Sequence, residues 1–176
     1  MTSIFLSQIE APDLPLIKGV LSSDFRNFSD FNSELSVSDV MQLYKESNNE
    51  NNYMFSIKIT REEDYKRTLC GVCGISDIDW ISRNGKLMFW MVDVGGFSAS
   101  PQDYVTSRLA FSKLLAFGFK ELNLYKLSFE VFDGNDVQAV LGDLGFVAEG
   151  VRRQAKFKRG KYIDTTVFSL VSQEFK

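Results

Sequence analysis

The apolar residues of this 176-residue chain switch between two kinds of spacing, in an order that few folds accommodate. Stretches of strand character, with alternating or continuous apolar residues, cover 53–60, 68–80, 87–92, 124–132, 151–158 and 162–171. The three-to-four-residue spacing of helices covers 11–21, 36–44, 101–119 and 135–144. Because strands and helices mix along one chain without a linker or repeat, we predict a single α/β domain over residues 1–176.

Capping and turn residues mark where some of these elements begin. Ser100 followed by Pro101 opens a helix, because the Ser side chain accepts a free amide and Pro suits the first helical position. Asn84-Gly85 predicts a tight hairpin turn, since both residues accept a positive φ. Residues 87–92 are all apolar, which is typical of a central strand covered on both faces.

Composition and charge narrow the chemistry. The net charge of −3 gives no basic face, so we predict no nucleic-acid partner. No apolar run approaches the roughly 18 residues that span a bilayer, and the first residues lack the features of a secretory signal. We therefore expect a cytoplasmic protein with no membrane partner. The chain contains no His, which excludes His-dependent triads and His-ligated zinc, and we predict no metal.

The two cysteines have the spacing of a redox motif, Cys70-Gly-Val-Cys73. On a regular strand, however, positions three apart point to opposite faces. We therefore interpret both as small, buried strand residues and not as a redox pair.

Several runs in the second half resemble one family. They are 116–127 (AFGFKELNLYKL), 129–135 (FEVFDGN), 144–152 (LGFVAEGVR) and 157–164 (FKRGKYID), with a weaker match around 13–16. In this order they resemble the GNAT (Gcn5-related N-acetyltransferase) superfamily, in particular the branch of ribosomal-protein N-terminal acetyltransferases and amino-sugar N-acetyltransferases. The resemblance implies a mixed, mostly antiparallel sheet of six to seven strands, splayed in the middle, with helices on both faces.

The same resemblance implies that acetyl-CoA is the co-substrate. Strand 87–93 would part from strand 127–132 and leave main-chain groups free for the pantetheine arm, and the pyrophosphate would meet the amino end of the next helix. The cofactor-binding residues implied are Met91, Val92, Asp93, Gln102, Val105, Ser107, Arg108 and Asn135. The chain departs from the family pattern at two points. Both glycines of the phosphate loop are replaced, and Leu141 stands where much of the family has a catalytic Tyr.

An amine must lose a proton before it can attack a thioester, and without His a carboxylate is the natural acceptor. The candidate catalytic residues are Glu130, on the strand beside the thioester, and Asp79. Asp77, Trp80 and Phe28 are the candidates for binding the acceptor. Each has a structural alternative: Glu130 as an ion-paired strand residue, the two Asp as an exposed pair near a turn, and the aromatic residues as core.

Three functions fit these residues. The first is acetyl transfer to the amine of a small molecule, such as a nucleotide-linked amino sugar, and the second is transfer to a protein N-terminus. An aromatic cleft with basic groups favours the first, and an acidic cleft favours the second. The third, a non-catalytic GNAT-fold binding or regulatory module, explains the lost glycines and Tyr together. The resemblance also allows a homodimer formed through sheet edges.

Overall fold

The computed structural model describes residues 3–22, 38, 41–42, 45, 48–60, 67–91, 101–132, 137–158 and 160–176. Its strands are β1 (Ser3–Gln8), β2 (Asn48–Asn49), β3 (Asn52–Thr60), β4 (Arg67–Asp79), β5 (Asn84–Met91), β6 (Lys126–Phe132), β7 (Val147–Lys158) and β8 (Lys161–Val171). They form one sheet in the order β1-β3-β4-β5-β6-β8-β7, with β2 beside β3. All neighbours are antiparallel except β5 and β6, which are parallel. The predicted fold class is confirmed.

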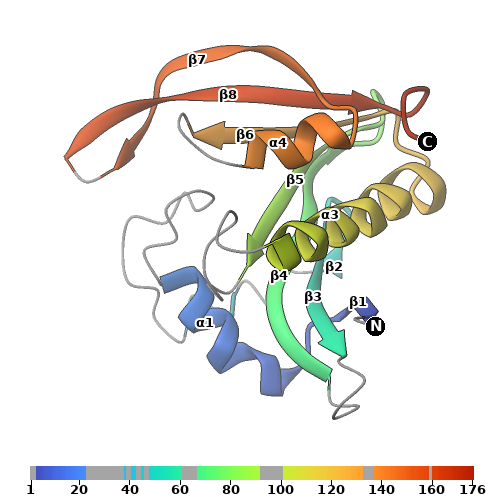
Figure 1. Cartoon of the computed structure of the whole chain (residues 1–176), viewed down its shortest axis with the longest axis vertical. Coiled ribbons are helices and arrows are strands. Elements are labelled where there is room, and N and C mark those ends of the chain that lie inside the picture. Colours follow the sequence, from blue (N-terminus) through green and yellow to red (C-terminus); the bar gives the residue numbers. More distant parts are fainter. Residues whose placement is uncertain are drawn as a thin grey trace.

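The helices of the described residues are η1 (Ala11–Asp13), α1 (Leu14–Ser22), α3 (Pro101–Ala116) and α4 (Val137–Asp143). A π-helical turn, Phe117–Glu121, extends α3. Figure 1 shows α3 crossing the middle of the sheet, with α4 beside β6 and the ribbon of β7 and β8 projecting past the body. None of these helices combines the length and apolar character needed to cross a bilayer.

Different helices pack against the two faces of the sheet. Ile57 of β3 belongs to the core that also contains residues of α3 and α4. The preceding residue, Ser56, points to the opposite face, where its hydroxyl donates to the Asp13 carboxylate at 2.8 Å, directly before α1. Helix α1 therefore begins on the face opposite α3, and the sheet is covered on both sides.

Aromatic rings form the core beneath α3. Phe89 of β5 stacks on Phe111 of α3, with ring centroids 4.0 Å apart and planes 13° apart. Phe111 also meets Phe129 of β6 edge-on at 5.4 Å. One helix residue thus joins two strands, and such pairs contribute about 0.5–1.5 kcal/mol each beyond the area they bury.

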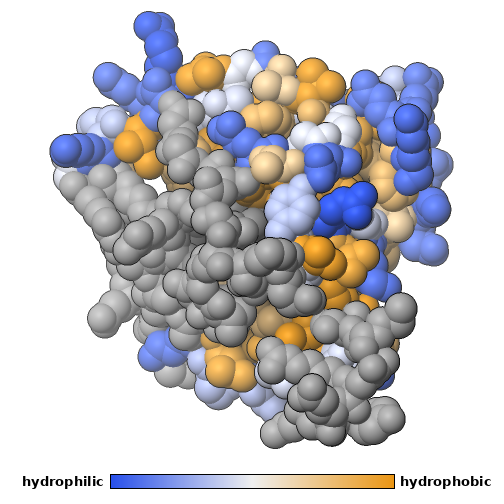
Figure 2. Space-filling model, in the orientation of Figure 1, coloured by the Kyte–Doolittle hydropathy of each residue, from blue (hydrophilic) through white to orange (hydrophobic). Residues whose placement is uncertain are grey.

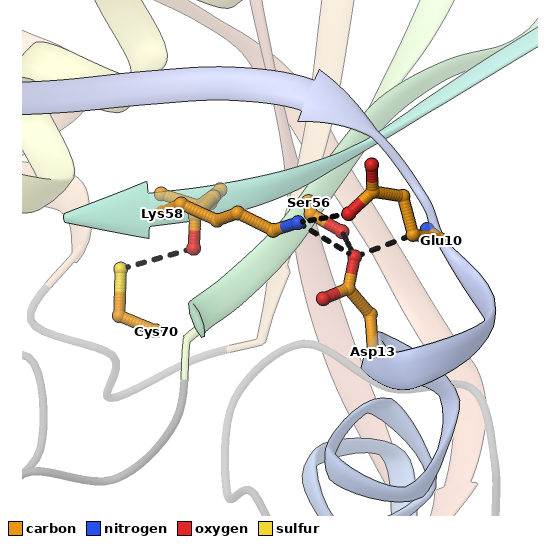
Figure 3. A network of polar contacts seen from close by, with 6 residues as sticks. Glu10, Asp13, Ser56, Lys58 and Cys70 are labelled. Carbon is orange, nitrogen blue, oxygen red and sulfur yellow. Dashed lines mark hydrogen bonds and ion pairs between the residues drawn. The ribbon is translucent and has the colours of Figure 1, made fainter. Parts of the chain in front are cut away.

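A cluster of polar side chains joins the start of η1 to β3. We call Glu10, Asp13, Ser56 and Lys58 the buried network (Figure 3), after its three buried members; the Glu10 side chain is 67% exposed. The Lys58 ammonium lies 3.0 Å from Asp13 and 3.1 Å from Glu10, and the Glu10 amide donates to Asp13 at 3.0 Å. Burial opposes ionisation of Asp13, but these donors outweigh it and lower the pKa of that carboxyl. The pKa of Lys58 is raised, because its two carboxylate partners likewise outweigh burial.

The hairpin before β5 turns earlier than predicted. Asn84 and Gly85 already belong to β5, and Asn84 pairs with Asp79. Residues 80–83 make the turn, and Arg83 takes the positive φ of 54°. The prediction of a tight Asn-Gly turn was therefore wrong. The Asp79 carboxylate stabilises a longer turn by accepting the amides of residues 81 and 82 at 3.0 and 3.1 Å.

Other expectations differ in detail. Strand β1 was not predicted, and of the predicted helix 36–44 most lies outside the described residues. Cys70 and Cys73 are buried and free, as predicted. A bulge shifts the register of β4 against β3 at Cys70, so the strict alternation assumed between the two does not hold. Burial raises the pKa of both thiols, that of Cys70 to about 12, so neither behaves as a reactive thiolate.

Candidate active site

The two central strands part, as the resemblance implied. Strands β5 and β6 pair only from Asn84 with Lys126 to Lys86 with Ser128. At this closed end the packing is tight, since a Cβ on Gly85 would lie 2.7 Å from Ile75 Cγ2. Beyond it β5 runs on to residue 91 and β6 to residue 132, and the described residues form no further pairs between them.

A cleft of about 540 Å³ opens where the strands part. It is lined by Met54, Ser76, Asp77, Lys86, Leu87, Met88, Phe89, Trp90, Ser128, Phe129, Glu130, Phe132, Arg152, Lys156, Thr165 and Val167. Phe129 contacts Phe111 of α3, so its neighbours Ser128 and Glu130 point away from that helix. The cleft therefore lies mainly on the sheet face opposite α3, with Phe89 and Phe129 reaching it through the gap.

Glu130 is held at both carboxylate oxygens. Its Oε2 accepts a hydrogen bond from Arg152 Nη1 at 3.0 Å. Its Oε1 accepts one from Thr165 Oγ1. The Glu130 side chain is 29% exposed, whereas Thr165 is almost fully buried. The carboxylate thus faces the cleft in a fixed orientation.

The remaining charges at the cleft are mostly basic. Asp77 forms a 3.0 Å ion pair with Lys86, and both side chains are exposed. Lys156, from the ribbon of β7 and β8, also lines the cleft. The described lining therefore holds two carboxylates, each paired with a cation, and three cations. Figure 2 shows hydrophilic residues at the upper left, where β7 and β8 project in Figure 1, and also along the right side of this face.

The structure brings only part of the predicted acceptor and catalytic set together. Glu130 and Asp77 line the cleft. Asp79 does not, because its carboxylate is occupied at the hairpin turn, where the Ser82 hydroxyl and the amides of that turn lower its pKa. Trp80 donates its indole N–H to the Glu50 carbonyl at 2.8 Å and also lies outside the lining. Phe28 falls outside the described residues.

The predicted cofactor residues that the structure describes lie at the end of β5 and on α3. Met91 is buried at the end of β5. On α3, Val105 and Arg108 are exposed and Ser107 is buried. Helix α3 begins at Pro101, close to the predicted cap, and the amides of a first helical turn have no partner within the helix. Gln102 belongs to that turn. Val92, Asp93 and Asn135 lie outside the described residues.

Three residues of the cleft, Arg152, Lys156 and Thr165, were not predicted from the sequence. Arg152 stands inside the run 144–152 that carries the resemblance, so a signal for it existed. Thr165 and Lys156 had none, because they reach the cleft through the pairing of β7 with β8 and of β8 with β6. Within the described ranges, no three His, Cys, Asp or Glu side chains gather in a way that could hold a metal ion.

Known proteins support the fold and the resemblance. No protein-family model matches the chain. It is 26% identical over 112 residues to the "Putative ribosomal N-acetyltransferase YdaF" of Bacillus subtilis, covering 63% of this chain. It is 38% identical over 61 residues to the uncharacterized N-acetyltransferase YoaA of the same organism, covering 34% of this chain. These matches span 58% and 34% of the two relatives' own lengths.

Longer matches agree with these. The uncharacterized N-acetyltransferase p20 of Bacillus licheniformis is 27% identical over 161 residues, which cover 86% of this chain and 80% of p20. The spermidine N-acetyltransferase of Vibrio cholerae, solved in complex with CoA and spermine, superposes with a TM-score of 0.81 at 19% identity. That superposition covers 97% of this chain and 96% of the other. The sequence runs, the parted strands and these matches agree: the chain has the fold of a GNAT N-acetyltransferase and is similar in sequence to several proteins named as N-acetyltransferases.

Proposed function

We propose that this chain is an acetyl-CoA-dependent N-acetyltransferase whose thioester arm lies between β5 and β6. The observation that carries the proposal is the end of β5–β6 pairing after Lys86 and Ser128. Beyond that point, β5 has main-chain groups on the β6 side that no strand in the described part of the chain pairs with, and a pantetheine amide could bond to them. Met91, Val92 and Asp93 would meet the thioester end. Gln102, Val105, Ser107 and Arg108 of α3 would lie nearest the pyrophosphate, and Asn135 would follow β6.

The reaction would be a direct transfer. The amine lone pair attacks the thioester carbonyl carbon, the carbon–sulfur bond breaks, and the amine proton passes to a base. Glu130 suits that role because it lies at the parted strands and faces the cleft. Leu141, at the family's Tyr position, is buried and has no acidic proton to donate. The leaving thiolate would therefore take a proton from water or another group.

Within the acceptors considered, we favour an amine carried by an anionic molecule, such as a nucleotide-linked amino sugar. Four aromatic residues and three cations line the cleft, and both carboxylates are already paired. A polyamine, the substrate named for the Vibrio cholerae neighbour, would meet more cations than carboxylates there. Transfer to a protein N-terminus is the second candidate, and the name of YdaF supports it.

An acceptor panel tests this proposal. CoA release is measured with acetyl-CoA and, in turn, a nucleotide-linked amino sugar, spermidine and a ribosomal-protein N-terminal peptide. We expect the highest kcat/KM with the nucleotide sugar. Lys156→Gln should raise the KM for that acceptor about tenfold, since a charge-assisted hydrogen bond contributes roughly 1.5–3 kcal/mol. The matched control is Lys161→Gln, which removes an exposed cation of the same ribbon that does not line the cleft.

Three results would count against it. A higher kcat/KM with spermidine would exclude the anionic acceptor. Equal effects of the Lys156 and Lys161 variants would show that the overall charge of the ribbon matters and not the cleft. No heat on titration of acetyl-CoA up to millimolar concentration would favour the non-catalytic binding module.

A further inference from the structure

We propose that Arg152 and Thr165 are positioning residues that together fix the carboxylate of Glu130 for proton transfer. The inference rests on the proposed function, since it requires Glu130 to act as the base. Neither residue is assigned a role by the sequence. The case depends on where three strands place three side chains.

The three residues come from consecutive strands of the sheet. Glu130 lies on β6, Thr165 on the neighbouring β8, and Arg152 on the edge strand β7. In the register, Thr165 stands opposite Phe132 on one side and opposite Arg152 on the other. Phe132 is two residues from Glu130, so both lie on the same face of β6, and the contact from Thr165 to Glu130 is a diagonal one. All three side chains therefore gather on the cleft face.

Each donor binds a different oxygen of the Glu130 carboxylate. Thr165 donates to Oε1 and Arg152 donates to Oε2 at 3.0 Å. A free Glu side chain samples many rotamers, and fixing it before the substrate arrives removes that entropy from the reaction step. Each carboxylate oxygen has two lone pairs, so Glu130 can still accept the proton of an amine in the cleft.

The two donors differ in what they can contribute. Thr165 is 1% exposed, so its hydroxyl sits in a fixed environment that water does not enter freely. Arg152 is 60% exposed, and an ion pair so accessible to water contributes little to folding. A contact that contributes little to stability but orients a cleft carboxylate is better explained by chemistry than by folding.

The local backbone supports this placement. The β7–β8 register shifts between Arg152 and Lys156, and Gln154 in that bulge has a φ of +50°. The main-chain N–H of Gln154 donates to the Asp164 carboxylate at 2.7 Å, which anchors the bulge to β8 next to Thr165. Bulges commonly redirect side chains near functional sites. Here one lies between the two β7 residues that line the cleft.

A set of double-mutant cycles tests the inference on the full-length enzyme. The single variants are Glu130→Gln, Arg152→Met and Thr165→Val, and the doubles combine each of the last two with Glu130→Gln. We expect Glu130→Gln to lower kcat about 10²- to 10⁴-fold, the usual contribution of a general base. Arg152→Met and Thr165→Val should each lower kcat about tenfold, with the KM for acetyl-CoA unchanged. In the Glu130→Gln background they should add less than about a twofold loss, because residues that act as one unit are not additive.

Two further variants separate positioning from packing. Thr165→Ser keeps the hydroxyl and should recover most of the rate lost in Thr165→Val. Arg153→Met removes an exposed cation beside Arg152 and should leave kcat unchanged. Thermal unfolding and acetyl-CoA titration show whether each variant is folded. Should Thr165→Val not fold, the Arg152 cycle and Thr165→Ser decide the question.

The outcomes are distinct. Full additivity with Glu130→Gln, or wild-type kcat in Arg152→Met, overturns the positioning role while the enzyme remains an acetyltransferase. Wild-type kcat in Glu130→Gln overturns it as well. An unmodified enzyme that acetylates none of the panel overturns the proposed function, and the inference with it.

Discussion

The buried network and the cleft contain ion pairs of the same length in opposite surroundings. Lys58 and Asp13 lie 3.0 Å apart with side chains 11% and 9% exposed. Lys86 and Asp77 also lie 3.0 Å apart, with side chains 67% and 63% exposed. Distance alone would rank the two pairs as equal. Access of water separates them, because water can replace either partner of the exposed pair and neither partner of the buried one.

This difference suggests a division of roles along the sheet. In the buried network every donor meets an acceptor from the same chain, and the cluster ties η1 to β3 (Figure 3). In the cleft the charges face an open volume, where an acceptor molecule can enter. Substitutions in the first cluster should therefore change stability, and substitutions in the second should change turnover.

The largest effect on stability is expected from Lys58→Met. Removing one partner leaves Asp13 charged and buried, which typically costs about 3–5 kcal/mol. Urea denaturation followed by circular dichroism measures the free energy of unfolding. The folded fraction should keep its kcat, because Lys58 does not line the cleft. The double variant with Asp13→Asn should recover part of the loss, since it removes the unpaired charge. A loss below about 1 kcal/mol in the single variant would show that burial does not separate the two clusters.

Lowering the pH should have a smaller effect on the free energy of unfolding. The pKa of Asp13 lies below its ordinary value of 3.8 in the folded chain. A lowered pKa contributes stability that is present above pH 3.8 and is lost as the pH falls through the folded-state value. The free energy of unfolding should therefore fall more steeply below pH 3.8 in the wild type than in Asp13→Asn. Parallel curves for the two proteins would mean that Asp13 is not stabilised as a carboxylate.

The same comparison explains what sequence could and could not predict. Periodicity and capping residues were enough to place α3 near residue 101, because these signals are local. The parted strands came from the resemblance, through runs that stand close together in the sequence. The hairpin turn was misplaced because the Asp79 carboxylate stabilises a four-residue turn, and such a side-chain contact outweighs the preference of Asn-Gly.

The candidate site was less predictable, since its contacts join distant positions. Glu130 could be proposed because the resemblance implies that its strand lies beside the thioester. Arg152 and Thr165 reach it only through the register of three strands and a bulge at Gln154. The net charge of −3 also concealed a local excess of positive charge, because residues 151–162 contain six Lys and Arg and no Asp or Glu. Averages over the chain do not show which charges will share a cleft.

The smallest effect is expected from Lys86→Met, and it makes the comparison quantitative. The substitution is the one proposed for Lys58, the broken distance is the same, and only the exposure of the pair differs. An exposed pair contributes about 0–1 kcal/mol, so the free energy of unfolding should change by no more than that. The same urea experiment measures both variants side by side. Equal losses would mean that the geometry of the pair, and not its access to water, determines its contribution, and the division between a structural and a functional cluster would then have no energetic basis.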